Sequence, residues 1–188
     1  LPDKEDLEFN LKNGKLSVSS KNFHADFATI SALDFPELEI KDETSSLSIP
    51  SSVLQRLLNK TAFAMASQDV RYYLNGLLIE YKEGKVNAVA TDGHRMALAT
   101  CLLGKESQVD GERQILPRKA VLELSKILRQ ENEDISITFG DSSLSIKDKN
   151  LDFSTKLIDG KFPDYEKVLP SGESSSFEVP KDSLQSAL

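Results

Sequence analysis

Hydrophobic residues alternate with polar residues over several short stretches of the chain, and this alternation predicts β-strands. The dipeptide Asn13-Gly14 separates the first two stretches and is typical of a hairpin turn. The strands expected from the pattern are residues 7–11, 16–18, 23–30, 74–82, 86–91, 96–103, 135–139, 143–147 and 151–158. The last three repeat the three-strand pattern of the first three, so antiparallel sheets are expected at both ends of the chain.

Two stretches instead carry apolar residues three and four positions apart, which predicts helices over residues 51–66 and 118–130. An apolar residue and a proline precede both helices, at Pro50 and Pro117, and the same pair recurs at Pro180. Proline can end a strand because its missing amide removes no ladder bond there, and a helix can begin just beyond it. We expect Ser51 or Ser52 to cap the first helix. The pattern therefore indicates a doubled strand–helix–strands unit.

A longer repeat of about 130 residues contains this doubled unit. Phe35-Pro36 aligns with Phe162-Pro163, and Ile49-Pro50 aligns with Val179-Pro180. Similar-looking hairpins would explain the matching strands, but they would not explain the common register of proline and helix. We therefore expect the C-terminal part of one domain at 1–43, a complete domain at 44–172 and the start of a third domain at 173–188.

Composition narrows the function classes. The chain has one cysteine, Cys101, which excludes a disulfide scaffold and fits a reducing cytosol. No apolar run reaches the roughly 18 residues of a membrane span. The net charge of −7, taken over the whole chain, argues against binding of nucleic acid. The first predicted helix nevertheless contains Arg56 and Lys60 and no acidic residue. A DNA-facing helix surface and an ordinary solvated surface both remain open at this point.

Residues 91–95 place polar side chains between two apolar runs, and Asp92-Gly93 supplies the chemistry of a turn. Asp92 beside His94 raises the hypothesis of a hydrolase. The sequence shows no nucleophile motif, phosphate-binding glycine loop or metal-ligand spacing, so a recognition surface or a plain turn is favoured over catalysis. A protein-interaction module without DNA binding is the other alternative.

Four motifs resemble the bacterial DNA polymerase III β subunit family, the sliding clamps, and the match covers essentially the whole chain. They are Gln-Asp-Val-Arg-Tyr-Tyr-Leu-Asn-Gly at 68–76, Ala-Thr-Asp-Gly-His-Arg-Met-Ala at 90–97, Pro-Arg-Lys at 117–119 and Asp-Gly-Lys-Phe-Pro-Asp-Tyr at 159–165. The resemblance implies an α+β processivity-clamp fold, a doubled βαβββ unit with two helices on one side of antiparallel sheets.

The resemblance also implies a function. Members of the family form a homodimeric ring that encircles double-stranded DNA without reading its sequence, and they act in the cytoplasm without catalysis, cofactor or metal. They tether the DNA polymerase III catalytic subunit, the clamp loader, other polymerases and repair proteins through short peptides. The basic helices are expected to line the ring, and no membrane partner is expected.

Site residues follow from the same resemblance. The residues expected to face DNA are Gln68, Arg71, Tyr72, Tyr73, Arg56, Lys60, Arg118 and Lys119. The residues expected to form the partner-peptide pocket are Leu74, Thr91, Gly93, His94, Arg95, Met96, Pro163, Lys167 and Val168. Met96 replaces the usual leucine and Lys167 a common arginine, which keeps the charge but loses the planar fork. Packing of Tyr72 or Tyr73 under their loop is the alternative to DNA contact.

Overall fold

The computed structural model describes residues 6–35, 45–103, 111–128, 133–170 and 177–187. The chain divides into two compact units, Leu1–Lys41 and Asp42–Leu188. The first unit is one antiparallel sheet followed by a short 3-10 helix. Its elements are β1 (Glu8–Lys12), β2 (Lys15–Ser20), β3 (Phe23–Ala28) and η1 (Ala32–Asp34). Asn13 and Gly14 close the predicted hairpin with positive φ angles of 50° and 73°.

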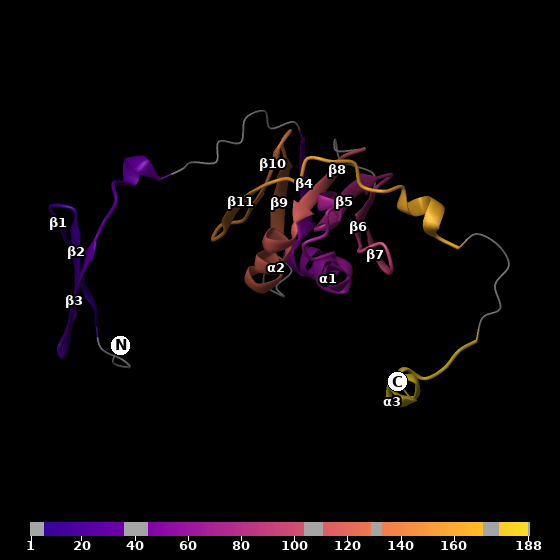
Figure 1. Cartoon of the computed structure of the whole chain (residues 1–188), viewed down its shortest axis with the longest axis horizontal. Helices are drawn as coiled ribbons and strands as arrows, with labels where there is room; N and C mark the ends of the chain where they lie inside the picture. The colour runs from indigo at the N-terminus through magenta and orange to yellow at the C-terminus, as the bar shows by residue number, and fades with distance from the viewer. Residues whose placement is uncertain (1–5, 36–44, 104–110, 129–132, 171–176, 188) are drawn as a thin grey trace. The chain divides into compact units, whose positions relative to one another are not determined.

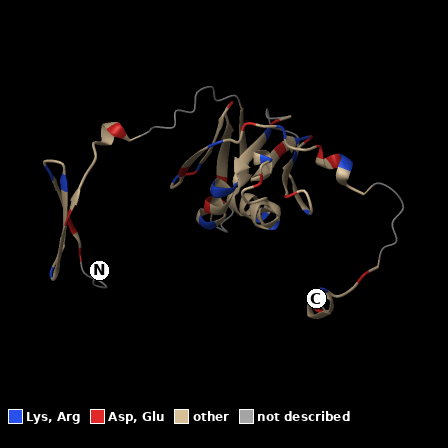
Figure 2. Ribbon diagram, in the orientation of Figure 1, with Lys and Arg blue, Asp and Glu red and all other residues tan. Residues whose placement is uncertain are grey.

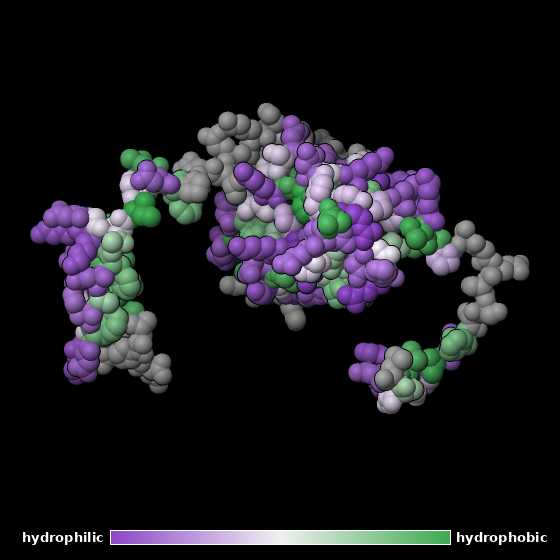
Figure 3. Space-filling view, in the orientation of Figure 1, coloured by the Kyte–Doolittle hydropathy of each residue, from purple (hydrophilic) through white to green (hydrophobic). Residues whose placement is uncertain are grey.

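Hydrophobic side chains gather along one side of the β1–β3 sheet (Figure 3). Phe9, Leu11 and Phe27 are the large hydrophobic residues that are exposed on its strands. The third strand ends at Ala28, two residues before the predicted end at Ile30.

The second unit contains two antiparallel sheets of four strands with two helices beside them (Figure 1). In chain order its main elements are β4 (Ser45–Pro50), α1 (Ser51–Thr61), η2 (Ala62–Ala64), η3 (Tyr72–Leu74), β5 (Gly76–Lys82), β6 (Lys85–Thr91), β7 (Met96–Leu102), β8 (Arg113–Pro117), α2 (Arg118–Ile127), β9 (Asp134–Phe139), β10 (Ser143–Lys147), β11 (Asp152–Lys156), η4 (Tyr165–Val168) and α3 (Lys181–Ala187). None of the described helices is long and apolar enough to span a membrane.

The two sheets are intertwined. Their strand orders are β11-β10-β9-β4 and β7-β6-β5-β8. Each βαβββ half therefore lends its first strand to the sheet of the other half: β4 pairs with β9, and β8 pairs with β5. This exchange confirms the doubled unit predicted from the sequence and joins its halves into one fold.

Proline occupies the N-cap of both helices, as the common register indicated. The predicted serine cap of α1 is wrong, because Pro50 holds the cap position and offers no acceptor side chain. Backbone carbonyls satisfy the first helical amides instead: Ser51 N–H donates to Glu133 O at 2.9 Å, and Arg118 N–H donates to Asn75 O at 3.1 Å. The start of α1 is thus hydrogen-bonded to the residue just before β9, and the start of α2 to the residue just before β5.

Both helices are shorter than predicted. Helix α1 ends at Thr61, whose hydroxyl donates to Leu57 O at 2.7 Å, and the chain continues as the 3-10 helix η2. Helix α2 ends at Ile127, and residues 129–130 of the predicted helix lie outside the described residues. The apolar spacing continues past Thr61, but the backbone there changes from α-helical to 3-10 hydrogen bonding.

Helices α1 and α2 lie side by side (Figure 1). The Gln55 side chain on α1 donates to Ser125 O at 3.2 Å and to Leu128 O at 2.6 Å at the end of α2. Buried residues of both helices and both sheets form one core, which includes Leu54, Leu58, Val121 and Leu124 from the helices. This arrangement confirms the predicted fold class, two helices on one side of antiparallel sheets.

The sheet β7-β6-β5-β8 also buries its other face. Because side chains alternate along a strand, Leu77 and Ile79 of β5 enter the helix-covered core while Leu78 enters a second cluster. Phe162 and Tyr165 from the segment after β11 complete that cluster, and both are 4% exposed. The segment is thereby fixed across this face of the sheet, next to the β6–β7 turn.

Candidate functional site

The turn between β6 and β7 is built by its own polar side chains. Asp92 Oδ1 accepts the backbone N–H groups of His94 at 2.9 Å and Arg95 at 3.0 Å. The Thr91 hydroxyl accepts from Gly93 N–H at 3.1 Å and donates to Arg95 O at 2.8 Å. These backbone hydrogen bonds lower the pKa of Asp92 to about 2. The turn is therefore fixed before any ligand arrives.

The same contacts weaken the hydrolase hypothesis. The Asp92 carboxylate binds two backbone amides and, at 3.0 Å, the Arg95 Nε, so it stabilises the turn and not the imidazole of His94. A general base needs an orienting partner and a nucleophile within reach. Within the described ranges, no group of three or more His, Cys, Asp or Glu residues could hold a metal ion. The turn is arranged to present His94 and Arg95, which are both exposed.

Arg71 joins the loop before β5 to this turn. Its Nε and Nη2 bind the two carboxylate oxygens of Asp69 at 3.1 and 2.8 Å, and Nη2 also donates to Asp92 O at 3.2 Å. The Arg71 side chain lowers the pKa of Asp69 to about 2, and the Asp69 carboxylate raises the pKa of Arg71. A Cβ added to Gly93 would lie 2.9 Å from Arg71 Nη1, so glycine makes room for this contact.

Arg95 joins the other side of the turn to η2, the 3-10 helix that follows α1. Its Nη2 donates to Phe63 O at 2.8 Å, and its guanidinium lies 5.7 Å from the centre of the Phe63 ring. The turn is therefore held from both sides by arginine side chains that reach backbone carbonyls.

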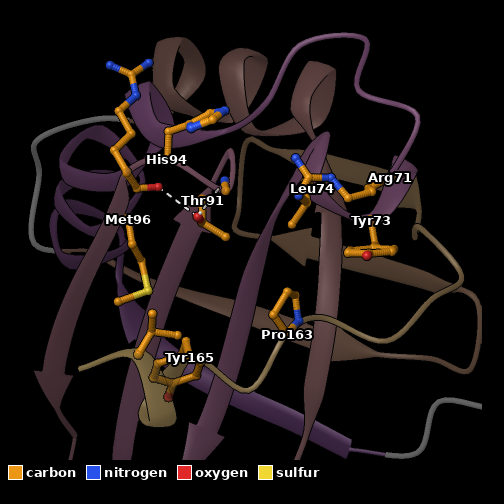
Figure 4. A pocket seen from close by; sticks show the side chains of 11 residues that line it. Arg71, Tyr73, Leu74, Thr91, His94, Met96, Pro163 and Tyr165 are labelled. Atoms are coloured by element: carbon orange, nitrogen blue, oxygen red, sulfur yellow. Dashed lines mark hydrogen bonds between the residues drawn. The ribbon is translucent and has the colours of Figure 1, made fainter. Parts of the chain in front are cut away.

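The loop, the turn and the segment around Pro163 enclose a cavity of about 380 Å³ (Figure 4). The residues that line it are Arg71, Tyr73, Leu74, Thr91, Gly93, His94, Arg95, Met96, Pro163, Tyr165 and Val168. The structure thus brings together every predicted pocket residue except Lys167, whose ammonium pairs with Asp164 at 2.8 Å outside the lining set. An apolar cavity with a polar rim of this size suits a small ligand or the side chains of a peptide.

Three lining residues were not predicted for the pocket. Arg71 and Tyr73 were assigned to DNA, and Tyr165 was not assigned at all. The motif at 159–165 ends at Tyr165, but it does not show that Phe162 and Tyr165 are buried in one cluster against the sheet. Sequence spacing does not show that this segment returns to the β6–β7 turn.

The other predicted DNA residues lie on α1, on α2 and in the loop. Arg56 and Lys60 are exposed on α1, and Lys119 is exposed on α2. Figure 2 shows the Lys and Arg positions of both helices in blue. Arg118 is half-buried and donates to Met65 O at 3.2 Å. Helix α1 contains no acid, and Glu123 on α2 pairs with Lys126 at 3.0 Å. Both helices thus add positive charge to an otherwise acidic chain.

The loop residues divide into exposed and packed ones. Gln68 is exposed and has a positive φ of 60°. Tyr72 is 58% exposed and Tyr73 is half-buried, with ring centres 5.8 Å apart in an edge-to-face arrangement. A Cβ on Gly160 would lie 3.3 Å from atoms of both tyrosines, so the pair packs against that glycine. Tyr73 is thus partly packed, while Tyr72 presents much of its ring to solvent.

Two intertwined βαβββ halves, two adjacent basic helices and this pocket define a sliding-clamp domain. Residues 48–164 match the family model described as DNA polymerase III beta subunit, central domain. The chain belongs to the DNA polymerase III β subunit family.

Relatives support this assignment. The beta sliding clamp of Pseudomonas aeruginosa is 41% identical over 172 residues, which cover 92% of this chain and 47% of the relative. That of Vibrio cholerae is 39% identical over 188 residues, covering 100% of this chain and 50% of the relative. A crystal structure of the Pseudomonas aeruginosa clamp bound to griselimycin superposes with a TM-score of 0.84 at 41% identity, covering 92% of this chain and 46% of that one. The chain spans about half the length of the curated relatives it matches.

Proposed function

We propose that this chain is part of a DNA sliding clamp, a processivity factor in which two identical subunits form a ring. The clamp would act in the cytoplasm without catalysis or cofactor. Residues 1–43 would be the end of its first domain, 44–172 the whole second domain and 173–188 the start of the third. Membership of the β subunit family supports this proposal. The observation that carries it is the preformed cavity beside the β6–β7 turn.

The cavity would hold short peptides of replication proteins. Leu74, Met96 and Pro163 supply apolar wall for the anchoring side chains of such a peptide. His94 and Arg95 supply polar groups at the rim. The partners would be the DNA polymerase III catalytic subunit, the clamp loader, and other polymerases and repair proteins that carry clamp-binding peptides.

The helices would face the DNA. Arg56, Lys60 and Lys119 are exposed on two adjacent helices, in a chain whose net charge is −7. Acidic surface elsewhere repels the duplex, so the helices are the favourable place for phosphates. Contacts to phosphates carry no sequence information, which allows a ring to move along the duplex. Gln68 and Tyr72 would reach DNA from the loop, while Arg71 and Tyr73 serve the pocket.

Processivity would follow from topology and tethering. A closed ring stays on the duplex without tight binding. A polymerase held by its peptide rebinds the primer end as an intramolecular event, at an effective concentration on the order of mM for short tethers.

The pocket is tested by Met96→Glu in a polypeptide of the relatives' full length that contains this chain, with Met96→Leu as the matched control. The probe is a fluorescently labelled clamp-binding peptide from a replicative polymerase, followed by fluorescence anisotropy. A carboxylate in this apolar wall should raise Kd by about tenfold or more, because it must lose its hydration when the peptide binds. Leucine has a similar volume and should leave Kd nearly unchanged. Equal affinities of Met96→Glu and the wild type would place the peptide elsewhere.

A further inference from the structure

Four polar residues form a row across the face of the sheet that the helices do not cover. The strand registers place them directly opposite one another, one from each strand. They are Thr100 on β7, Asn87 on β6, Glu80 on β5 and Arg113 on β8. A polar row is unexpected here, because Leu78 on the same face of β5 belongs to an apolar cluster.

The hydrogen bonds of the row converge on the Glu80 carboxylate. The Thr100 hydroxyl donates to Asn87 Oδ1 at 2.8 Å, and Asn87 Nδ2 donates to Glu80 Oε2 at 3.2 Å. Arg113 Nε lies 3.4 Å from Glu80 Oε1. Glu80 is only 4% exposed, and a buried carboxylate costs stability unless charge and hydrogen bonds compensate it. An apolar residue could pack at the same position in the sheet, so packing alone does not explain the carboxylate.

Glu80 holds the segment that forms one wall of the cavity. The Tyr165 hydroxyl donates to Glu80 Oε2 and accepts from Asn87 Nδ2 at 3.4 Å. The Arg113 guanidinium lies 6.0 Å from the centre of the Tyr165 ring. Burial and then the hydrogen bond to Glu80 raise the pKa of Tyr165, so its hydroxyl keeps the proton that it donates.

A second tether comes from the same strand. Lys82, two residues after Glu80 and therefore on the same face of β5, pairs with Glu166 at 3.2 Å. Both contacts hold the short helix η4 (Tyr165–Val168), and the two ends of η4, Tyr165 and Val168, line the cavity. Lys82 and Glu166 are both largely exposed, so the buried contact of Glu80 with Tyr165 is the stronger restraint.

We propose that Glu80 is a positioning residue for peptide binding: through the Tyr165 hydroxyl it sets the position of η4 and so the distance across the pocket from Val168 to the β6–β7 turn. The proposal rests on the proposed function of the cavity. Met96 packs against the same cluster as Tyr165, so a shift of the tyrosine reaches both sides of the pocket. Glu80 itself lies outside the lining set and acts only through Tyr165.

The test compares Glu80→Leu, Tyr165→Phe, their double variant and Glu80→Gln in the full-length polypeptide, with the same labelled peptide. Loss of one buried hydrogen bond should raise Kd by about two- to tenfold in each of the first two variants. The double variant should have a Kd no higher than that of the single variant with the higher Kd, because Glu80→Leu and Tyr165→Phe each remove the same hydrogen bond. Glu80→Gln keeps an acceptor for the Tyr165 hydroxyl and should restore most of the affinity.

A general loss of stability is separated from positioning by Ile146→Val on β10, a buried core change in the other sheet. It should lower the Tm and leave Kd unchanged. The methyl signals of Val168 in NMR spectra of the peptide-free protein should shift in Glu80→Leu and Tyr165→Phe and stay in place in Ile146→Val. Tyr165→Phe keeps the ring, so it reports on the hydroxyl even where Glu80→Leu does not fold.

Wild-type Kd and unshifted Val168 signals in both Glu80→Leu and Tyr165→Phe would overturn the positioning role while leaving the proposed pocket intact. Additive effects in the double variant, or an equal loss of affinity in Ile146→Val at the same loss of Tm, would also overturn it. A wild-type protein that does not bind the peptide would instead contradict the proposed function, and the role of Glu80 with it.

Discussion

Gly93→Ala is the substitution that most directly connects the backbone of the turn to the pocket. Gly93 has a φ of +89°, a conformation that costs a residue with a Cβ about 1–2 kcal/mol. For a domain of this size each kcal/mol lowers the Tm by about 2–4 °C, so a fall of roughly 2–8 °C is expected. The new methyl group would also lie 2.9 Å from Arg71 Nη1. The guanidinium can swing away, but it then loses its bond to Asp92 O.

Gly111→Ala is the matched control. Gly111 belongs to the same compact unit and has a φ of +92°, and a Cβ there would meet nothing within 4 Å. It carries the same backbone strain as Gly93→Ala without touching Arg71. The difference between the two variants therefore removes the backbone strain and leaves the effect of the new methyl group at the cavity wall, where it meets Arg71.

Both variants are compared by thermal unfolding and by peptide anisotropy in the full-length polypeptide. Both should lose similar stability, and only Gly93→Ala should weaken peptide binding, by about two- to tenfold, the worth of one hydrogen bond in the pocket wall. Equal Kd values for Gly93→Ala and Gly111→Ala would refute the idea that Arg71 supports the pocket through the turn.

Two further predictions concern the turn and the start of β5. Asp92 has its pKa lowered to about 2, against an ordinary value of 3.8, so its stabilising effect is complete above pH 3.8 and is lost as the pH falls through about 2. The amide NMR signals of His94 and Arg95 should titrate with that midpoint, and a midpoint at the ordinary value would show that the carboxylate does not hold the turn. Gly76→Ala should lower the free energy of unfolding by about 1–3 kcal/mol, because its Cβ would lie 2.4 Å from the backbone oxygen of Leu116; an unchanged denaturation curve would contradict that close contact.

Local sequence patterns were enough to predict much of the fold. The alternation of side chains predicted the strands of the four-stranded sheets because their apolar side chains enter a core, and the common proline register predicted both helix starts. Helix ends were missed because the switch to a 3-10 turn after Thr61 leaves the apolar spacing unchanged. The exchange of β4 and β8 between the two halves could not be read from spacing, since it depends on pairing between distant strands.

In the candidate site, too, local features could be predicted from the sequence, while contacts between distant residues could not. The turn at 91–96 was visible as a polar break between apolar strands, and the structure places it beside Pro163 and Val168. The role of Arg71 was not visible, because its carbonyl partner at Asp92 is 21 residues away. The contact of Tyr165 with Glu80 spans 85 residues and depends on strand register, so no local motif indicates it.

We propose above all that this chain belongs to a ring that is held on DNA by topology. The direct measurement is gel filtration of the full-length polypeptide after a clamp loader has placed it on nicked circular duplex DNA, at high salt, followed by cutting the circle. We expect the protein to elute with the intact circle, because a closed ring needs no strong phosphate contacts, and to leave once the DNA is linear. Release from the intact circle at high salt, or retention on the linear form, would contradict it.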